Sequence, residues 1–275
     1  VQGSDQLLNP DFYHALGENA ILDWVNYDKK KIGYAMSIGS TNVKYNPYDQ
    51  KEISYYLKKF DAISVRENSA VSQMKDLFDV KVDWVLDPVF LCNKEYYMSV
   101  AQKYIKSEPA GIFAYILDLN NELYIKLNDI AGISKQHLYI LTDAAKNDEE
   151  QQKFSVEKWL GEIINCRYMI ADSFHGICFA IIFRKNFVVL RNEYRGGTRF
   201  DSILGLLGLK NRMISNIDEL SEDLLIYDEI DFDAVDEKLN IEKKRSLRWL
   251  EKALKREHDF KYSDFDLFLE ERCRN

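Results

Sequence analysis

The sequence lacks the segments that would place a chain in or across a membrane. It has no run of about eighteen apolar residues, the length that a spanning helix needs. Its first residues show no basic region followed by an apolar stretch and a cleavage site. These absences predict a soluble, cytoplasmic protein.

Cysteine and histidine are scarce, at four residues each. The cysteines form no CxxC pair and the histidines lack the spacing of metal ligands, so we expect reduced thiols and no metal site. Neither the P-loop pattern GxxxxGK[ST] nor GxGxxG occurs, which leaves nucleotide binding by these routes unsupported. The net charge of −8, with acidic residues concentrated after Asn216, disfavours nucleic acid as a partner.

Short β-rich or apolar runs alternate with helical patterns along most of the 275 residues. This alternation is typical of parallel sheets covered by helices, so the predicted fold class is α/β. The predicted strands are KIGYAMSIG (31–39), DAISVR (61–66), VDWVLD (82–87), GIFAYILD (111–118), HLYILTD (137–143), RYMIAD (167–172) and FVVL (187–190). The predicted helices cover 49–60, 67–78, 121–132, 155–166 and 176–183.

The polar, mixed segment between Cys92 and Pro109 is the weakest part of this pattern and predicts a link between two α/β halves. We expect domains at 1–105 and 106–232, followed by a covering helical segment at 233–275. Because VQGSD resembles the end of a strand followed by a turn, the N-terminal domain is expected to be truncated at its start.

The stretch ADSFHGICFA (171–180) places His175 between a buried strand pattern and an apolar helix. In open α/β sheets ligands bind beyond the carboxyl ends of strands, and the next helix offers free N–H groups to an anion. A lone histidine near apolar residues is more often structural. This position, with Gly176 beside it, favours a ring that faces a ligand and exchanges protons near neutral pH.

Four other loops with polar side chains follow predicted strands, namely GSDQ (3–6), RENS (66–69), DP (87–88) and RGGTR (195–199). Arg66 is either a surface arginine paired with Glu67 or Asp61, or a guanidinium that binds a carboxylate or phosphate. Asp5 and Asp87 are either bases or caps of the following turn, and for Asp87, before a proline, the turn is preferred. RGGTR has the composition of a phosphate-binding loop and equally of a solvated turn.

Several segments in order carry a family resemblance: GSDQLLNP, KIGYAMSIG, SVRENSAV, VDWVLDPVFL, FSVEKWLGEIINCRYMIADSFHG and RNEYRGGTRFDSILGLLGL. Together they resemble bacterial polysaccharide pyruvyl transferases from residue 1 to about residue 214. SFHG alone is a weak signal, so the specificity lies in the ordered set.

The resemblance implies two Rossmann-like domains facing a cleft, as in glycosyltransferases of type B, with the last helix returning toward the N-terminal domain. It also implies transfer of a pyruvyl group from phosphoenolpyruvate to sugar hydroxyls, which forms a pyruvate ketal and releases phosphate. The acceptor would be a lipid-linked or nucleotide-linked precursor of a capsule, exopolysaccharide or other cell-envelope polymer. A lipid-linked acceptor would bring the protein to the inner face of the membrane. No cofactor or metal is expected.

The same resemblance assigns roles to site residues. Arg66 would grip phosphoenolpyruvate, and His175 would act as general acid or would stabilise the leaving phosphate. Ser173 and the N–H groups around Gly176 would hold the phosphate at the helix start. Arg195 and Arg199 would be additional ligands of the anion. Either Asp5 or Asn9 would stand where a base accepts the proton of the sugar hydroxyl.

The sequence departs from the family in two places. It lacks the initial strand with an NYGG-like loop, and LLNP stands where VWNP is expected, which puts sugar stacking there in doubt. Two alternatives stay open: a sugar-nucleotide glycosyltransferase of the same architecture, and a catalytically silent saccharide-binding relative.

Overall fold

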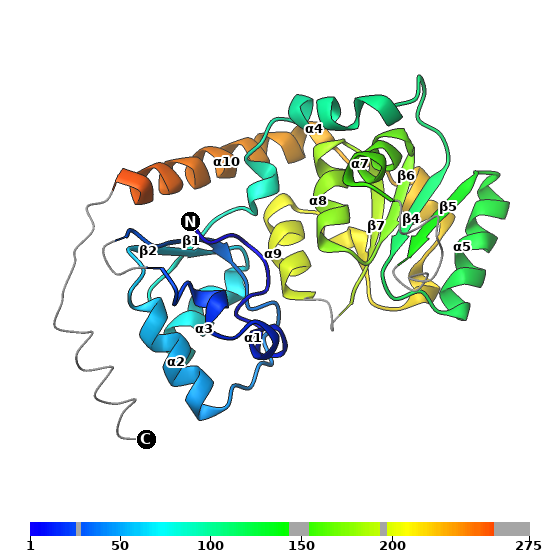
Figure 1. Cartoon of the computed structure of the whole chain (residues 1–275). Coiled ribbons are helices and arrows are strands. Elements are labelled where there is room, and N and C mark those ends of the chain that lie inside the picture. The colour runs from blue at the N-terminus through cyan, green and yellow to red at the C-terminus, as the bar shows by residue number, and fades with distance from the viewer. Residues whose placement is uncertain (26–28, 143–153, 193–196, 256–275) are drawn as a thin grey trace.

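Two parallel β-sheets organise the chain in the computed structural model, which describes residues 1–25, 29–142, 154–192 and 197–255 (Figure 1). The strands are β1 (Ile32–Met36), β2 (Ala62–Val65), β3 (Asp83–Trp84), β4 (Ile112–Ile116), β5 (Leu138–Thr142), β6 (Tyr168–Ala171), β7 (Asn186–Leu190) and β8 (Met213–Ile214). The α-helices of the described residues are α1 (Pro10–Leu16), α2 (Pro47–Leu57), α3 (Asn68–Phe78), α4 (Lys94–Ala101), α5 (Asn121–Ser134), α7 (Val156–Asn165), α8 (Phe174–Ile182), α9 (Gly197–Leu207) and α10 (Phe232–Lys255).

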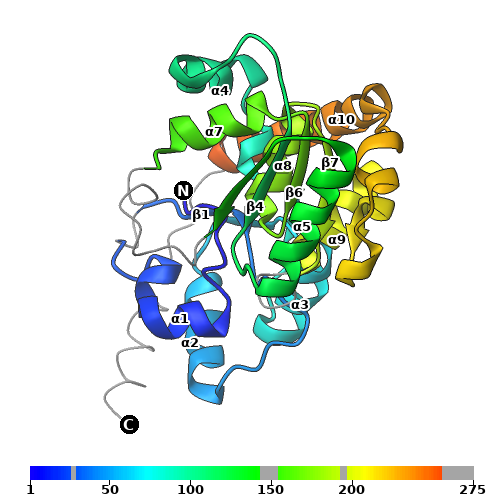
Figure 2. The same ribbon diagram turned by 90° about the vertical axis from the view of Figure 1, so that its right-hand side faces the viewer.

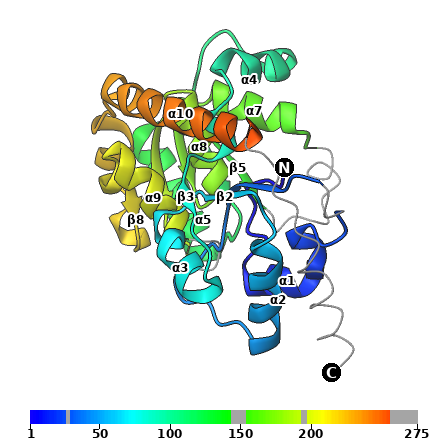
Figure 3. The same cartoon turned by 90° about the vertical axis from the view of Figure 1, so that its left-hand side faces the viewer.

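The first sheet has the order β1-β2-β3, with every pair parallel. Gln2 pairs with Gly33 of β1, also in the parallel sense, so the start of the chain lies along this sheet. Helices α2 and α3 cover one face of the sheet, while α10 covers the other (Figures 1 and 3). The chain steps from strand to strand in one direction, so the loops after β1, β2 and β3 leave from one edge.

The second sheet has the order β5-β4-β6-β7-β8, also entirely parallel. Helix α5 packs on one face, and α7, α8 and α9 pack on the other, which separates two hydrophobic cores (Figure 2). The chain adds β5 on one side of β4 and then β6 on the other side, so the strand order changes direction between β4 and β6 although all strands stay parallel. Open α/β sheets bind ligands at such a switch point. The loop that carries His175 follows β6.

Side-chain caps explain where several helices begin. Asn46 accepts a hydrogen bond from the N–H of Asp49, and Ser155 accepts one from the N–H of Lys158. Each cap accepts a hydrogen bond from an N–H group that the first helical turn leaves unpaired. Pro47, at the start of α2, has no N–H group that would need a partner. The predicted start of the helix at Ser155 is confirmed.

The segment expected to link two halves is helical and packed. It contains α4 and a short 3-10 helix, η3 (Gln102–Tyr104), which lie against α7. Asn165 anchors it, because its Nδ2 donates to the carbonyl of Tyr104 and its Oδ1 accepts from the N–H of Lys106, each at 2.8 Å. The seven predicted strands are confirmed, whereas α1, α4, α9 and β8 were not predicted.

Helix α10 crosses from the second sheet to the first (Figure 3). Ser246 accepts a hydrogen bond from the N–H of Leu86, and the indole of Trp249 donates to Asp83 at 2.7 Å. The first sheet ends before the predicted boundary at 105 and the second begins after it, although the boundary itself stays a prediction. None of the described helices is long and apolar enough to cross a membrane.

Two glycines make a matched test of the fold. Gly111, before β4, has φ +73° and a Cβ there would overlap the carbonyl oxygen of His137, while Gly132 lies in α5 with open space around its Cα. We expect Gly111→Ala to lower the free energy of unfolding by about 2 kcal/mol or more. Gly132→Ala should raise it by about 0.5–1 kcal/mol, because alanine favours a helix. Urea unfolding midpoints measure both, and equal effects of the two changes would contradict the expectation.

Candidate active site

Arg66 and Asp87 meet at the carboxyl edge of the first sheet. Arg66 directly follows β2, and Asp87 lies shortly after β3, so parallel pairing brings both to the same edge. Nη1 of Arg66 donates to Oδ2 of Asp87 at 2.7 Å. The two side chains are 0% and 1% exposed, which makes this a fully buried ion pair.

His175 reaches the same carboxylate from the second sheet. Its Nε2 lies 3.6 Å from Oδ2 of Asp87, an ion-pair contact longer than a hydrogen bond. The His175 side chain is 42% exposed, so the ring lies between solvent and the buried pair. His175 and Arg66 therefore both contact one oxygen atom of Asp87.

Asp87 does more than open a turn. Its Oδ1 accepts from the N–H of Val89 and caps the 3-10 helix η2 (Pro88–Phe90), which confirms the turn interpretation for one oxygen. Burial by itself raises the pKa of this carboxyl, but the contacts with His175 and Arg66 outweigh it and hold the pKa at about 2. Asp87 is thus ionised at neutral pH. The sequence favoured a turn role for Asp87, and the structure adds its contacts with Arg66 and His175.

The Arg66 guanidinium keeps two nitrogens for another partner. Within the described residues, its Nε and Nη2 are buried and make no hydrogen bond. Oδ1 of Asp5 lies 3.9 Å from Nη2, and this aspartate side chain is 80% exposed. An arginine with two unused donors offers a bidentate site for a carboxylate or phosphate.

Arg199 lies against the same aromatic ring as Arg66. The guanidinium carbons of Arg66 and Arg199 are 5.1 Å and 5.0 Å from the centroid of Phe174. Burial, and then the positive charge of Arg66, lower the pKa of Arg199 to about 10, so it remains cationic at neutral pH. Phe174 therefore holds two buried cations next to His175.

Glu67 places a buried carboxyl group near these arginines. Its side chain accepts hydrogen bonds from the Ser37 hydroxyl and from the N–H of Gly39, in the loop after β1. Burial raises the pKa of Glu67, while the nearby Arg66 and the Ser37 bond oppose that shift. Sequence reasoning did not assign Glu67 to the site, because only the fold shows that this helix-starting residue points inward.

The other predicted site residues have the following places. Ser173 is buried and caps α8 by accepting from the N–H of Gly176 at 3.4 Å. Gly176 leaves room for Tyr115 and Met169, so its lack of a side chain serves packing. Asn9 caps α1 by accepting from the N–H of Asp11. Arg195 lies outside the described residues.

The described residues contain no group of three or more His, Cys, Asp or Glu side chains that could hold a metal ion. The three cysteines in this part of the chain, Cys92, Cys166 and Cys178, are free thiols. The groups available at the junction of the two sheets are two arginines, the carboxyl groups of Asp5, Glu67 and Asp87, and one imidazole.

A parallel α/β protein with two buried arginines and a histidine at strand ends has the equipment of an enzyme for an anionic substrate. The chain belongs to the polysaccharide pyruvyl transferase family, whose model matches residues 1–194, and it is a transferase. The family resemblance identified from the sequence is confirmed. Neither the curated proteins nor the solved structures contain a match.

The pH dependence of stability tests the role of Asp87. Its folded-state pKa of about 2 lies below the ordinary value of 3.8, so the ionised carboxylate stabilises the fold above pH ~4, and this contribution is lost as the pH falls to ~2. Asp87→Asn should cost about 3 kcal/mol at neutral pH, because it leaves Arg66 buried without its partner.

We expect the difference between wild type and Asp87→Asn to shrink as the pH falls below ~4. Urea unfolding at several pH values measures it. Asp76→Asn, a change at an exposed aspartate of α3, is the matched control and should differ little from wild type at any pH. A difference for Asp87→Asn that stays constant with pH would contradict the assignment.

Proposed function

We propose that the chain transfers the pyruvyl group of phosphoenolpyruvate to hydroxyl groups of a saccharide, forming a pyruvate ketal and releasing phosphate. Family membership supports pyruvyl transfer to a polysaccharide or its precursor. The observation that carries the choice of donor is the buried Arg66 guanidinium, whose Nε and Nη2 make no hydrogen bond within the described residues.

Phosphoenolpyruvate bears a carboxylate and a phosphate on one small carbon frame, so its binding needs more than one cation. Arg66 would bind one of these groups through its two unused nitrogens, and Arg199, which also lies against Phe174, would attract the other. Ser173 and the start of α8, with Arg195 and Gly176, are further candidates to surround the phosphate.

In the proposed reaction a proton is added to the methylene carbon, which becomes a methyl group, and positive charge develops at the neighbouring carbon. One sugar hydroxyl adds to that carbon, and a second hydroxyl takes the place of phosphate, which leaves with the C–O bond electrons. The two hydroxyl protons balance the proton on the methyl group and the proton taken by phosphate.

His175 is our candidate for the group that donates a proton to the methylene carbon, or that stabilises the leaving phosphate. Its partial exposure gives it access to a bound substrate, while Asp87 lies 3.6 Å from its Nε2.

A base must accept the proton of the attacking hydroxyl. Asp5 is our first candidate, because its exposed carboxylate lies 3.9 Å from Nη2 of Arg66. Asn9 is the alternative position from the sequence, and its side chain already caps α1. An exposed aspartate beside the donor site is better suited to take a proton than an amide is.

The wider setting follows from the same proposal. The two parallel sheets would form two Rossmann-like domains facing a cleft, as in glycosyltransferases of type B. The acceptor would be a lipid-linked or nucleotide-linked precursor of a capsule or exopolysaccharide. The enzyme would act in the cytoplasm, at the inner face of the membrane when the acceptor is lipid-linked.

Arg66→Lys tests donor binding while keeping a positive charge next to Asp87. We expect phosphoenolpyruvate to bind at least about tenfold more weakly, because a lysine ammonium cannot offer the bidentate geometry of a guanidinium. Titration calorimetry measures the affinity. Arg167→Lys is the matched control, at an exposed position before β6. Equal affinity in Arg66→Lys and wild type would remove Arg66 from the donor site.

His175→Asn tests turnover. We expect product formation to fall by about 10²–10⁴-fold, because a general acid contributes about that much, while phosphoenolpyruvate still binds. The assay mixes enzyme, phosphoenolpyruvate and a panel of lipid-linked or nucleotide-linked sugars, and follows the gain of one pyruvyl group by mass spectrometry. His137→Asn, at an exposed histidine before β5, is the control.

The same assay tests the proposed function as a whole. If no sugar in the panel gains a pyruvyl group and phosphoenolpyruvate does not bind, the choice of donor is wrong. If His175→Asn releases phosphate as fast as wild type in the presence of an accepted sugar, the role of His175 is wrong.

A further inference from the structure

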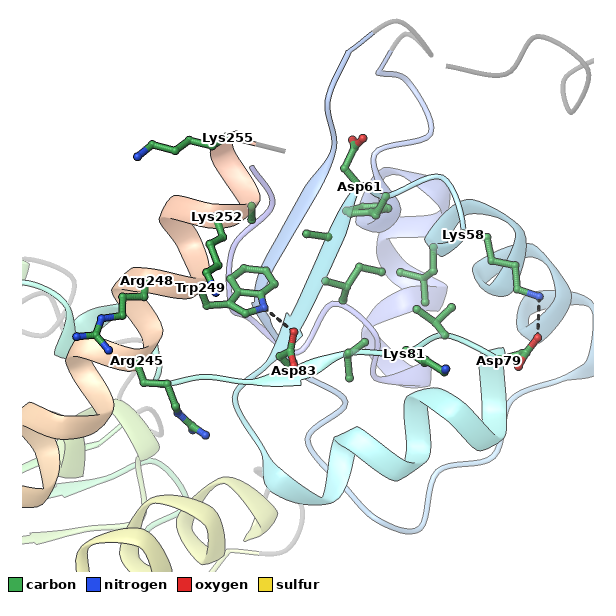
Figure 4. Close-up of a pocket in the computed structure, with 17 residues that line it drawn as sticks. Lys58, Asp61, Asp79, Lys81, Asp83, Arg245, Arg248, Trp249, Lys252 and Lys255 are labelled. Carbon is green, nitrogen blue, oxygen red and sulfur yellow. Dashed lines mark hydrogen bonds and ion pairs between the residues drawn. The ribbon is translucent and has the colours of Figure 1, made fainter. Parts of the chain in front are cut away.

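A second concave surface lies away from the Arg66–Asp87 pair, between α10 and the amino-terminal ends of β2 and β3 (Figure 4). Its volume is about 1180 Å³, which is large enough for an extended ligand. Apolar side chains such as Leu57, Ile63 and Val80 form its floor, and charged side chains surround them.

The carboxylates that line this pocket already have partners. Asp79 pairs with Lys58 and Lys75. Asp83 accepts the indole hydrogen bond of Trp249, as Figure 4 shows, and Asp61 accepts from the N–H of Lys31. Each of the three carboxylates therefore already has a partner in the protein.

The cations that line the pocket fall into two groups. Arg245 and Lys255 are paired, with Glu242 and Glu251 respectively. Lys81, Arg248 and Lys252 also line the pocket, but they are exposed and make no ion pair or hydrogen bond within the described part of the chain. The pocket thus presents uncompensated positive charge, although the net charge of the chain is −8.

Trp249 gives one wall of the pocket a rigid aromatic surface. Its indole N–H is bonded to Asp83, and its ring lies 5.9 Å from the ring of Tyr34, so both contacts restrict its orientation. A fixed indole beside cations and apolar residues suits a ligand with both apolar and anionic parts. Acidic sugars have this character, because a sugar ring packs its C–H face on an aromatic ring while its acidic group stays free.

Helix α10 also connects this pocket to the candidate active site. Ser246 bonds the N–H of Leu86, next to Asp87, and Lys252 lies six positions further along the same helix. The pocket and the candidate site lie at opposite edges of the first sheet, so an acceptor that reaches both must extend along α10.

We propose that this pocket binds an acidic segment of the saccharide acceptor, at sugar residues other than those that receive the pyruvyl group. Lys81, Arg248 and Lys252 bind the carboxylates of that segment, and Trp249 packs against a sugar ring. This inference rests on the proposed function, since a saccharide acceptor follows from the family. It adds a preference for acidic over neutral acceptors.

Titration calorimetry with defined probes tests this site. The probes are a hexasaccharide of galacturonic acid, the neutral hexasaccharide maltohexaose, and inorganic phosphate. We expect the acidic hexasaccharide to bind wild type, and to bind at least about tenfold more weakly to a variant that combines Lys81→Gln, Arg248→Gln and Lys252→Gln. Its affinity should also fall as salt is raised.

A control variant removes the same charge elsewhere, by combining Lys44→Gln, Lys106→Gln and Lys244→Gln at exposed positions outside the pocket. It should bind the acidic hexasaccharide like wild type. Trp249→Phe keeps an aromatic wall and should retain most of the affinity. Thermal unfolding of each variant checks that the fold is intact.

The pocket assignment is overturned if the acidic hexasaccharide does not bind wild type, or if it binds the pocket variant as tightly as wild type. Binding of maltohexaose or phosphate with equal affinity overturns the preference for acidic sugars. Phosphoenolpyruvate affinity is measured on the same proteins. If phosphoenolpyruvate does not bind wild type, the proposed donor is wrong. If phosphoenolpyruvate binds the pocket variant as tightly as wild type, the pocket and the donor site are separate, and each can be rejected without the other.

Discussion

The buried ion pair between Arg66 and Asp87 is the constraint around which the rest of the site is arranged. Removing two charges from water costs several kcal/mol each, and their mutual attraction offsets this only with good geometry and further hydrogen bonds. Asp87 meets that requirement through Arg66 and Val89. Arg66 does not, since two of its nitrogens make no hydrogen bond within the described residues. This state is the basis of our proposal that Arg66 binds the anionic donor.

Several neighbours make such a cation tolerable. Glu67 places a buried carboxyl group nearby, and Phe174 presents its ring to both Arg66 and Arg199. Low local polarity strengthens every charge interaction there, including those with a bound anion. The same burial that makes the unpaired Arg66 donors costly therefore strengthens their interaction with any small anion that pairs with them.

The site depends on contacts between elements far apart in the chain. Arg66 and Asp87 come from the first sheet, whereas His175, Phe174 and Arg199 come from the second part of the chain. Helix α10 then returns to the first sheet, where Ser246 supports the backbone next to Asp87 and Trp249 forms the wall of the basic pocket. One helix thus links the candidate reaction centre to the surface where we place part of the acceptor.

Strongly patterned elements could be predicted from the sequence, and the seven predicted strands are present. The prediction failed where tertiary packing overrides a weak local pattern. Helix α4 packs against α7, and Asn165 of α7 bonds the segment that follows α4, at Tyr104 and Lys106. The polar sequence of α4 reveals neither contact. Helix α9 begins within RGGTR, whose glycines and charges predict a turn, and β8 has only two residues.

The sequence by itself determined the α/β class, the family and the candidacy of Arg66 and His175, because strand ends and ordered motifs are local properties of the chain. Only the tertiary structure decided that Asp87 joins those two residues and that Glu67 turns inward. It also decided that Lys81 and α10 share a pocket. Burial and the pairing of charges depend on which distant elements are neighbours, and local sequence carries no record of that.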